Sequence, residues 1–200
     1  MAELAPVSPP LGLFLPYCNP ESITLKMKER GLMHGSLTGD DFAITDTNGR
    51  PICMCKGKVM SFSGRKTFSD PRGTVLFALK DKKCALSKSF RGVGLNGEEL
   101  FKVKGHWSLF GSKSSIHFTN ASNNEPVILE LKGDWLDRSA KVTFQGRPVA
   151  SIGRSYMNFG QMFSDRQTYF VTVAPGVDLA LMAAICVCLD ERENDQPKQG

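Results

Sequence analysis

Eleven consecutive apolar residues near the carboxyl end constrain the fold more than any other feature of this 200-residue chain. They occupy 179–189, and their leucine, alanine and methionine content favours a helix, since a strand of that length would be unusual. Asp178 precedes them as a candidate N-cap. A helix that is apolar on every side must be buried, yet the run is shorter than the roughly 20 residues that cross a bilayer. We therefore expect a helix enclosed by protein, with Asp190, Glu191 and Glu193 marking where the chain emerges into solvent.

Short runs of β-branched and aromatic residues, separated by turn signals, fill most of the chain before this helix. Asp46-Thr47-Asn48-Gly49 is a typical hairpin signal between two such runs. Many short strands at this spacing predict an antiparallel sandwich or barrel. A closed barrel with a helix through its middle accommodates both observations. Further strand-like runs occupy 75–79, 100–103, 115–118, 127–131, 142–144 and 169–173.

Composition sets the expected domain boundaries. Residues 1–20 contain five of the eleven prolines, which predicts an extended, Pro-rich lead-in. Residues 21–192 then form a single domain, and 193–200 form a polar tail.

The cysteines and the amino-terminal residues bear on the cellular compartment. Two Cys-x-Cys pairs, Cys53/Cys55 and Cys186/Cys188, lie among apolar residues, whereas zinc sites typically use a wider spacing with polar turns. Buried, reduced thiols are therefore expected. Residues 1–10 carry no basic n-region, and their prolines interrupt any apolar core, so they do not resemble a secretory signal. We expect a cytoplasmic protein, with the inner face of the plasma membrane or the nucleus as further locations.

Several motifs follow one another in an informative order. They are ELFKVKG at 99–105, HWSLFGS at 106–112, LKGDW at 131–135, GRPV at 146–149 and the apolar helix at 178–189. In this order the chain resembles the LURP-one-related (LOR) group of tubby C-terminal-like domains, whose superfamily also contains phospholipid scramblases. The resemblance covers roughly residues 20–192. It implies a mainly β fold, a closed antiparallel barrel of about twelve strands around a buried hydrophobic C-terminal helix.

The same resemblance is a weaker guide to function, because one fold serves several functions. Tubby proteins bind phosphoinositides, whereas most LOR members have no assigned biochemical activity. The phosphoinositide ligands of tubby proteins do not map residue by residue onto this chain.

Motifs that would indicate catalysis are weak. Gly92–Gly97 satisfies G-x-G-x-x-G, but Glu98 and Glu99 follow it and then a strand, so a β-turn is favoured over a nucleotide loop. The three histidines are scattered without metal-ligand spacing, and Cys18 has no evident base nearby. We therefore expect no enzyme, no cofactor and no metal.

Charge placement gives the strongest functional signal. The chain carries a net charge of +5, but residues 50–104 contain thirteen basic and four acidic side chains, a net +9. Anionic lipid surfaces attract Lys and Arg by about 1 kcal/mol each. The alternative is that lysines simply occupy outward strand positions, as in any soluble barrel. The candidate head-group ligands are Lys56, Lys58, Arg65, Lys66, Lys80, Lys82, Lys83, Lys102 and Lys104.

These observations favour a non-enzymatic protein that binds anionic phospholipid head groups, phosphoinositides included. The alternative is a protein-interaction or stress/defence-response scaffold with an unidentified protein partner. A scramblase-like lipid transporter ranks lower, because its helix would have to enter a membrane. Nucleic acid ranks last, because the basic segment lacks exposed interleaved aromatic residues and contains no recognisable nucleic-acid-binding module. A monomer is favoured, although the sequence leaves the oligomeric state open.

Overall fold

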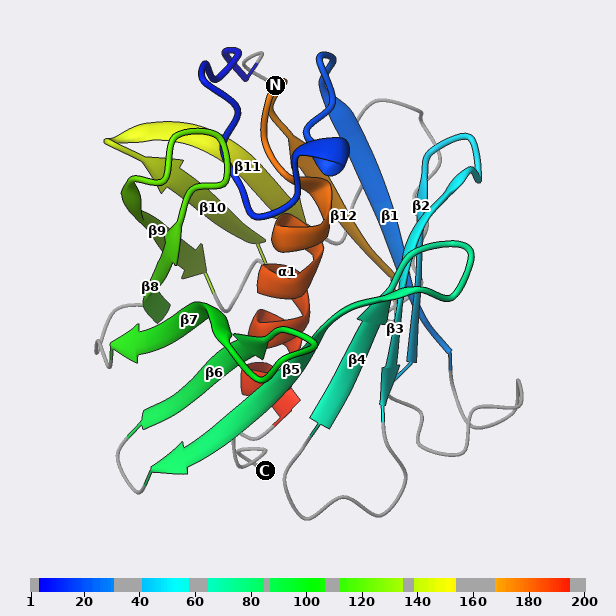
Figure 1. The fold of residues 1–200 in the computed structure, drawn as a ribbon, viewed down its shortest axis with the longest axis vertical. Helices are drawn as coiled ribbons and strands as arrows, with labels where there is room; N and C mark the ends of the chain where they lie inside the picture. The colour runs from blue at the N-terminus through cyan, green and yellow to red at the C-terminus, as the bar shows by residue number, and fades with distance from the viewer. Residues whose placement is uncertain are drawn as a thin grey trace.

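Twelve antiparallel strands close into a barrel around a single long helix (Figure 1). The computed structural model describes residues 4–30, 41–57, 65–84, 87–106, 112–134, 139–153 and 168–194. Each strand pairs with the next along the chain, and β1 pairs with β12 to close the barrel. This confirms the predicted fold class.

The strands have ordinary lengths, and the helix is longer than the apolar run that predicted it. The elements are a 3-10 helix η1 (Leu15–Tyr17), β1 (Ile23–Arg30), β2 (Asp41–Asp46), β3 (Pro51–Gly57), β4 (Arg65–Ser69), β5 (Val75–Cys84), β6 (Ser87–Val93), β7 (Glu99–His106), β8 (Ser112–Thr119), β9 (Pro126–Asp134), β10 (Ser139–Phe144), β11 (Arg147–Gly153), β12 (Thr168–Val173) and α1 (Leu179–Asn194).

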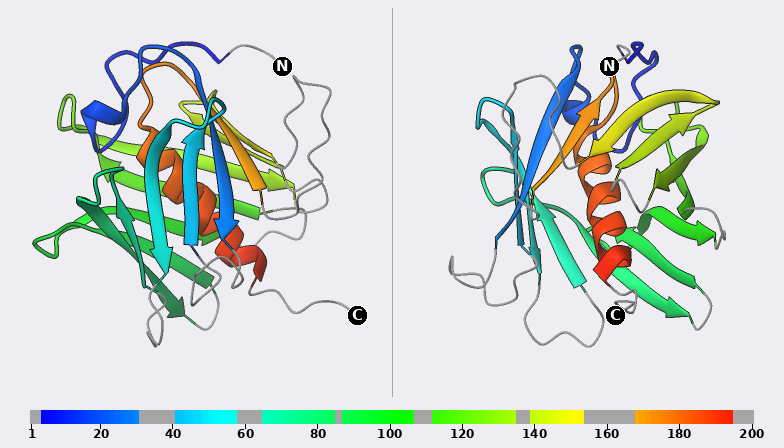
Figure 2. Two further views of the ribbon diagram at one scale, coloured as in Figure 1. Left: turned by 90° about the vertical axis from the view of Figure 1, so that its right-hand side faces the viewer. Right: turned by 180° about the vertical axis from the view of Figure 1, so that it is seen from behind.

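Side chains alternate between the barrel interior and its outer face because successive residues of a strand point in opposite directions. In β2, for example, Phe42 and Ile44 are buried, whereas Ala43 and Thr45 are partly exposed. The inward side chains enclose α1, whose residues 179–189 are each at most 5% exposed. Figure 2 shows α1 passing between the strands. Among the residues that the structure describes, none of the helices is both long and apolar enough to span a bilayer.

The expectation that the chain reaches solvent at Asp190, Glu191 and Glu193 is wrong for Asp190, whereas Glu191 is partly exposed and the side chain of Glu193 is not among those described. Asp190 is only 5% exposed, and its Oδ1 accepts a hydrogen bond of 2.7 Å from the Tyr169 hydroxyl of β12. The Glu191 Oε1 lies 2.7 Å from the Nζ of Lys66. Asp190 remains inside, and Glu191 only partly exposed, because α1 continues beyond its apolar run and meets polar partners on the barrel wall.

The segment before β1 closes the end of the barrel at which α1 begins (Figure 1). The Val7 N–H donates to the Pro175 carbonyl oxygen at 2.9 Å, and the Leu11 N–H donates to the Gly176 carbonyl oxygen at 2.8 Å. Gly12 packs so closely on Asp178 that a Cβ at this position would overlap the Asp178 side chain.

Asp178 ties this segment to the helix. Its Oδ1 accepts hydrogen bonds from the N–H groups of Ala180 and Leu181, at 2.8 and 3.1 Å, which confirms the predicted N-cap. Its Oδ2 accepts from the N–H groups of Leu13 and Phe14, both at 2.9 Å. Burial raises the pKa of Asp178, while these four donors act in the opposite direction.

Candidate functional site

Four basic side chains form a row across β4, β5, β6 and β7 on the outside of the barrel. Arg65 lies opposite Lys80, Lys80 lies opposite Arg91, and Arg91 lies opposite Lys102. We call these four residues the basic row. His117 of β8 lies opposite Lys102 and continues it. Directly opposite residues of neighbouring strands stand about 5 Å apart, so the row places one cation at each strand step.

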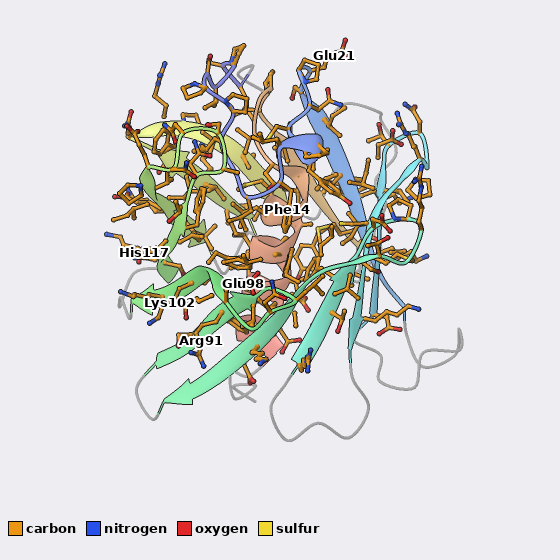
Figure 3. All side chains as sticks on the ribbon, in the orientation of Figure 1. Phe14, Glu21, Arg91, Glu98, Lys102 and His117 are labelled. Carbon is orange, nitrogen blue, oxygen red and sulfur yellow. The ribbon has the colours of Figure 1, made fainter. Side chains whose placement is uncertain are left out.

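The outward direction of the basic row follows from its inward neighbours. Phe90 is 2% exposed and precedes Arg91, and Phe101 is 1% exposed and precedes Lys102. Because side chains alternate, burying these phenylalanines turns the cations outward. Figure 3 shows Arg91, Lys102 and His117 on the same side of the barrel.

The basic row does not stabilise the pairing of β4 to β7, because like charges placed directly opposite one another are destabilising. Three successive pairs within the basic row are of this kind. Each costs some tenths of a kcal/mol up to about 1 kcal/mol in a sheet. An anion bound over the row would remove this repulsion.

Arg91 occupies a central position and retains hydrogen-bonding capacity. Its Nη1 lies 3.7 Å from the Glu99 Oε2, and both side chains are more than 40% exposed, so the pair is weak. Its Nε is covered and has no hydrogen-bond partner within the described part of the chain. A guanidinium presents a fork of donors that matches a phosphate, so Arg91 is suited to hold one.

The other sequence-predicted ligands occupy several places. Lys56 is exposed on β3 opposite Thr67, two residues from Arg65, and therefore flanks the basic row. Lys104 is exposed two residues beyond Lys102, on the same face of β7. Lys82 and Lys83 belong to β5, but their side chains are not among those described, and Lys58 lies outside the described residues.

Lys66 is brought to a different environment from the other predicted ligands. Its side chain is 7% exposed and points into the barrel, where it pairs with Glu191. Its Nζ also lies 5.6 Å from the centroid of the Phe42 ring. Lys66 therefore connects α1 to the barrel wall and does not belong to the outer face.

Arg91 and His117 were not among the predicted ligands, although both belong to the face that the structure assembles. Their positions depend on strand register. The predicted turn at 92–97 is confirmed, with the Gly94 N–H donating to the Glu98 carbonyl oxygen at 2.9 Å and with Gly97 at φ +87°. That turn, with the irregularity next to it, places Arg91 opposite Lys102.

The thiols offer little reactivity. Cys53 and Cys55 of β3 face the interior, and Cys186 and Cys188 are buried on α1. Burial raises the pKa of Cys53 to about 12, and burial together with the nearby Asp178 charge raises that of Cys18 to about 12. Within the described residues, no three His, Cys, Asp or Glu side chains gather as a metal site would require.

A small cavity of about 260 Å³ lies away from these strands, between residues 5–8 and the β10–β11 hairpin. Val7, Phe144 and Pro148 contribute apolar surface to it, and Arg147 lies at its lining. It shares no lining residue with the basic row.

Comparison with known proteins agrees with the fold. A family model described as LURP-one-related matches residues 23–190. Among curated proteins of Arabidopsis thaliana, Protein LURP-one-related 15 is 26% identical over 182 residues, which cover 88% of this chain and 82% of that protein. Protein LURP-one-related 10 is 26% identical, with 88% and 92% covered, and Protein LURP1 is 27% identical, with 88% and 87% covered.

One solved structure is also similar. It is an X-ray structure of a protein from Arabidopsis thaliana, with a TM-score of 0.61 and 22% sequence identity. The similarity covers 90% of this chain and 96% of the other, and at this identity it bears on the fold alone.

Proposed function

The chain belongs to the LURP-one-related family, and we propose that it is a non-enzymatic protein that binds anionic phospholipid head groups through the basic row. The observation that carries this proposal is the register of β4 to β7, which sets Arg65, Lys80, Arg91 and Lys102 directly opposite one another. The row supplies positive charge along a line on an outer face, where a membrane surface can reach it.

The size of the attraction supports a physiological role. Each Lys or Arg near an anionic membrane surface contributes about 1 kcal/mol, so the four residues together contribute about 4 kcal/mol, roughly a thousandfold in affinity. The exposed end of the Arg91 guanidinium adds donors suited to phosphate oxygens. The resemblance to tubby domains makes phosphoinositides the head groups to test first. We place the protein at the cytoplasmic face of the membrane.

Co-sedimentation with vesicles tests the proposal. The wild-type chain should pellet with phosphatidylcholine vesicles that contain phosphatidylserine or a phosphoinositide, and not with phosphatidylcholine alone. The combined variant Lys80→Glu, Arg91→Glu, Lys102→Glu should bind at least about a hundredfold more weakly, because three attractions of about 1 kcal/mol are lost. Binding should weaken as ionic strength rises.

A matched control separates this surface from net charge. Arg50, Arg72 and Arg147 are exposed residues outside the basic row. Their combined change to Glu alters the net charge by the same amount, and this variant should bind nearly as well as the wild type. Circular dichroism should show that both variants fold, because all six side chains are on the outside.

Two results would overturn the proposal: no pelleting of the wild type with any anionic vesicle, or equal loss in both variants. The first would favour the scaffold alternative. Lipid transport would require α1 to leave the barrel, in which Asp178 and Glu191 hold its two ends.

A further inference from the structure

His117 of β8 adds to the basic row a group whose charge can change near neutral pH. It lies directly opposite Lys102. Its neighbours along the strand, Ile116 and Phe118, are 0% and 6% exposed, so the alternation of side chains turns the imidazole outward. An unperturbed histidine gains its charge as the pH falls through about 6.5. The outer face therefore carries four permanent cations in line with a fifth group that is cationic only at lower pH.

His117 is close enough to the centre of the basic row to act on the same bilayer. In a barrel of twelve strands, each strand step turns the outer face by about 30° on average. A bilayer that lies over β6 and β7 meets Arg91 and Lys102, and His117 is one strand step further (Figure 3). Opposite residues stand about 5 Å apart, which is within the screening length of about 8 Å at physiological ionic strength. A charge on His117 thus acts on the same patch of lipid as the charge on Lys102.

A hydrogen bond to Ser115 couples the charge of the imidazole to a second donor. The His117 Nε2 lies 2.9 Å from the Ser115 Oγ, two residues back on the same face of β8. A neutral ring with no proton on Nε2 accepts from this hydroxyl, whereas the Nε2 of an imidazolium donates to the hydroxyl oxygen. The Ser115 hydroxyl then directs its proton away from the ring, where a head-group oxygen can accept it. Protonation therefore supplies a positive charge and turns a hydroxyl donor outward.

Charged groups of both signs surround His117 on the outer face. Among the described side chains they are Arg91 of β6, Lys102 and Lys104 of β7, Lys113 of β8 and Glu130 of β9. Lys102 is directly opposite and disfavours the imidazolium, while Glu130 is a diagonal neighbour and favours it. Ile128, which is directly opposite on β9, carries no charge. An anionic bilayer over this face adds negative charge and so favours the imidazolium.

We propose that His117 makes membrane binding depend on pH, so that the protein binds an anionic bilayer more tightly as the pH falls from about 7.5 to about 5.5. This inference rests on the proposed function. Binding and protonation are linked, because a surface that favours the imidazolium is bound more strongly by the protonated protein. One further cation at an anionic surface is worth about fivefold in affinity. The pH interval covers most of a histidine titration, so the expected increase is about threefold.

Co-sedimentation at pH 5.5 and pH 7.5, at constant ionic strength, tests the proposal. The probe is a phosphatidylcholine vesicle that contains phosphatidylserine, because the second ionisation of a phosphomonoester near pH 6 would change the lipid charge within this interval. The wild type should bind about threefold more tightly at pH 5.5. His117→Gln should bind nearly equally at both pH values, as the wild type does at pH 7.5. His117→Lys should also bind nearly equally at both, as the wild type does at pH 5.5.

A matched control and a second readout separate the proton on His117 from other effects of pH. Thr119 is the next outward residue of β8 and is exposed, so Thr119→Gln places the same amide on the same strand and should keep the full pH dependence. Calorimetry in two buffers of different ionisation enthalpy measures the proton directly. Near pH 7, binding should take up roughly a third of a proton per wild-type molecule and none per molecule of His117→Gln.

The possible failures point to different conclusions. Wild-type binding of equal strength at both pH values, without proton uptake, refutes the role of His117 and leaves the proposed function standing. A pH dependence that survives in His117→Gln or His117→Lys assigns it to another titrating group and also refutes this inference. Absence of vesicle binding by the wild type at either pH refutes the proposed function and this inference together.

Discussion

Replacement of Asp178 by alanine should destabilise the protein far more than replacement of any exposed turn aspartate. The Asp178 carboxylate accepts four backbone hydrogen bonds and is 0% exposed. Loss of a helix N-cap costs about 1–2 kcal/mol, which covers the N–H groups of Ala180 and Leu181. The N–H groups of Leu13 and Phe14 lose their acceptor in a part-buried position, at about 1 kcal/mol each. The expected loss is about 3–4 kcal/mol.

Asp46 provides the matched control. Its Oδ1 accepts hydrogen bonds from the N–H groups of Asn48 and Arg50, at 2.9 and 2.8 Å, in an exposed turn. Water can replace this carboxylate, so Asp46→Ala should cost about 1 kcal/mol or less. Asp178→Asn should lie between the two, because its amide keeps one oxygen acceptor but directs an NH2 group at two N–H donors.

Urea unfolding followed by circular dichroism measures all three variants. The midpoint should shift while the slope of the free energy against urea stays constant, as for a change in stability alone. The reasoning is refuted if Asp178→Ala loses no more free energy of unfolding than Asp46→Ala.

Three further predictions concern the thiols, the buried ion pair and the centre of the basic row. Burial raises the pKa of Cys18 and Cys53 from 9.0 in the unfolded chain to about 12. In a Cys84→Ser variant, which lacks the one cysteine whose side chain is not described, the remaining thiols should therefore react slowly with a thiol reagent at pH 8 until the protein is denatured. Because these folded-state pKa values are raised, the stability they contribute is complete below pH 9 and should be lost as the pH rises toward 12, measurable as a falling urea midpoint. Lys66→Ala should cost about 2 kcal/mol by removing the ion pair with the partly buried Glu191, yet leave vesicle affinity unchanged; a large loss of affinity in the folded variant would return Lys66 to the binding surface. Glu99→Gln should strengthen vesicle binding about threefold, because it removes the carboxylate that competes for Arg91; weaker binding would contradict this role.

The sequence predicted the features that depend on neighbouring residues. The helix begins at Leu179, directly after its predicted cap, because an aspartate before an apolar run stabilises a helix start wherever the run is buried. The hairpin turn at Asp46–Gly49 is confirmed for the same reason, since Gly49 adopts a φ of +83° that its neighbours could not adopt as easily. The barrel itself followed from combining the apolar helix with the many short strands.

Features that depend on register were not predictable in the same way. Arg65 meets Lys80 only because the β4–β5 pairing shifts between Phe68 and Ser69, and such an irregularity leaves no clear trace in one sequence. Counting residues from the turn between β4 and β5, without the shift, would have paired Arg65 with Leu79 instead of Lys80.

The interior position of Lys66 could have been predicted from the alternation of side chains along its strand. It lies two residues from Phe68 in a strand, so the two share a face, and Phe68 is fully buried. Strand alternation alone therefore assigned Lys66 to the interior, whereas a count of basic residues grouped it with Arg65. The buried position of Asp190 had no such local signal, because its partner Tyr169 belongs to another strand.

The contact between the outer face of β6 and a membrane is the central claim, and a site-specific fluorescent label tests it most directly. Ser89 lies two residues from Arg91 on the same face, and Thr45 lies on β2, four strands away around the barrel. An environment-sensitive fluorophore would be attached to Ser89→Cys or to Thr45→Cys in the Cys84→Ser background. Addition of phosphatidylcholine vesicles containing phosphatidylserine should then shift the emission of the label at 89 to shorter wavelength and leave the label at 45 unchanged. An equal shift at both positions, or a shift only at 45, would contradict binding through the basic row.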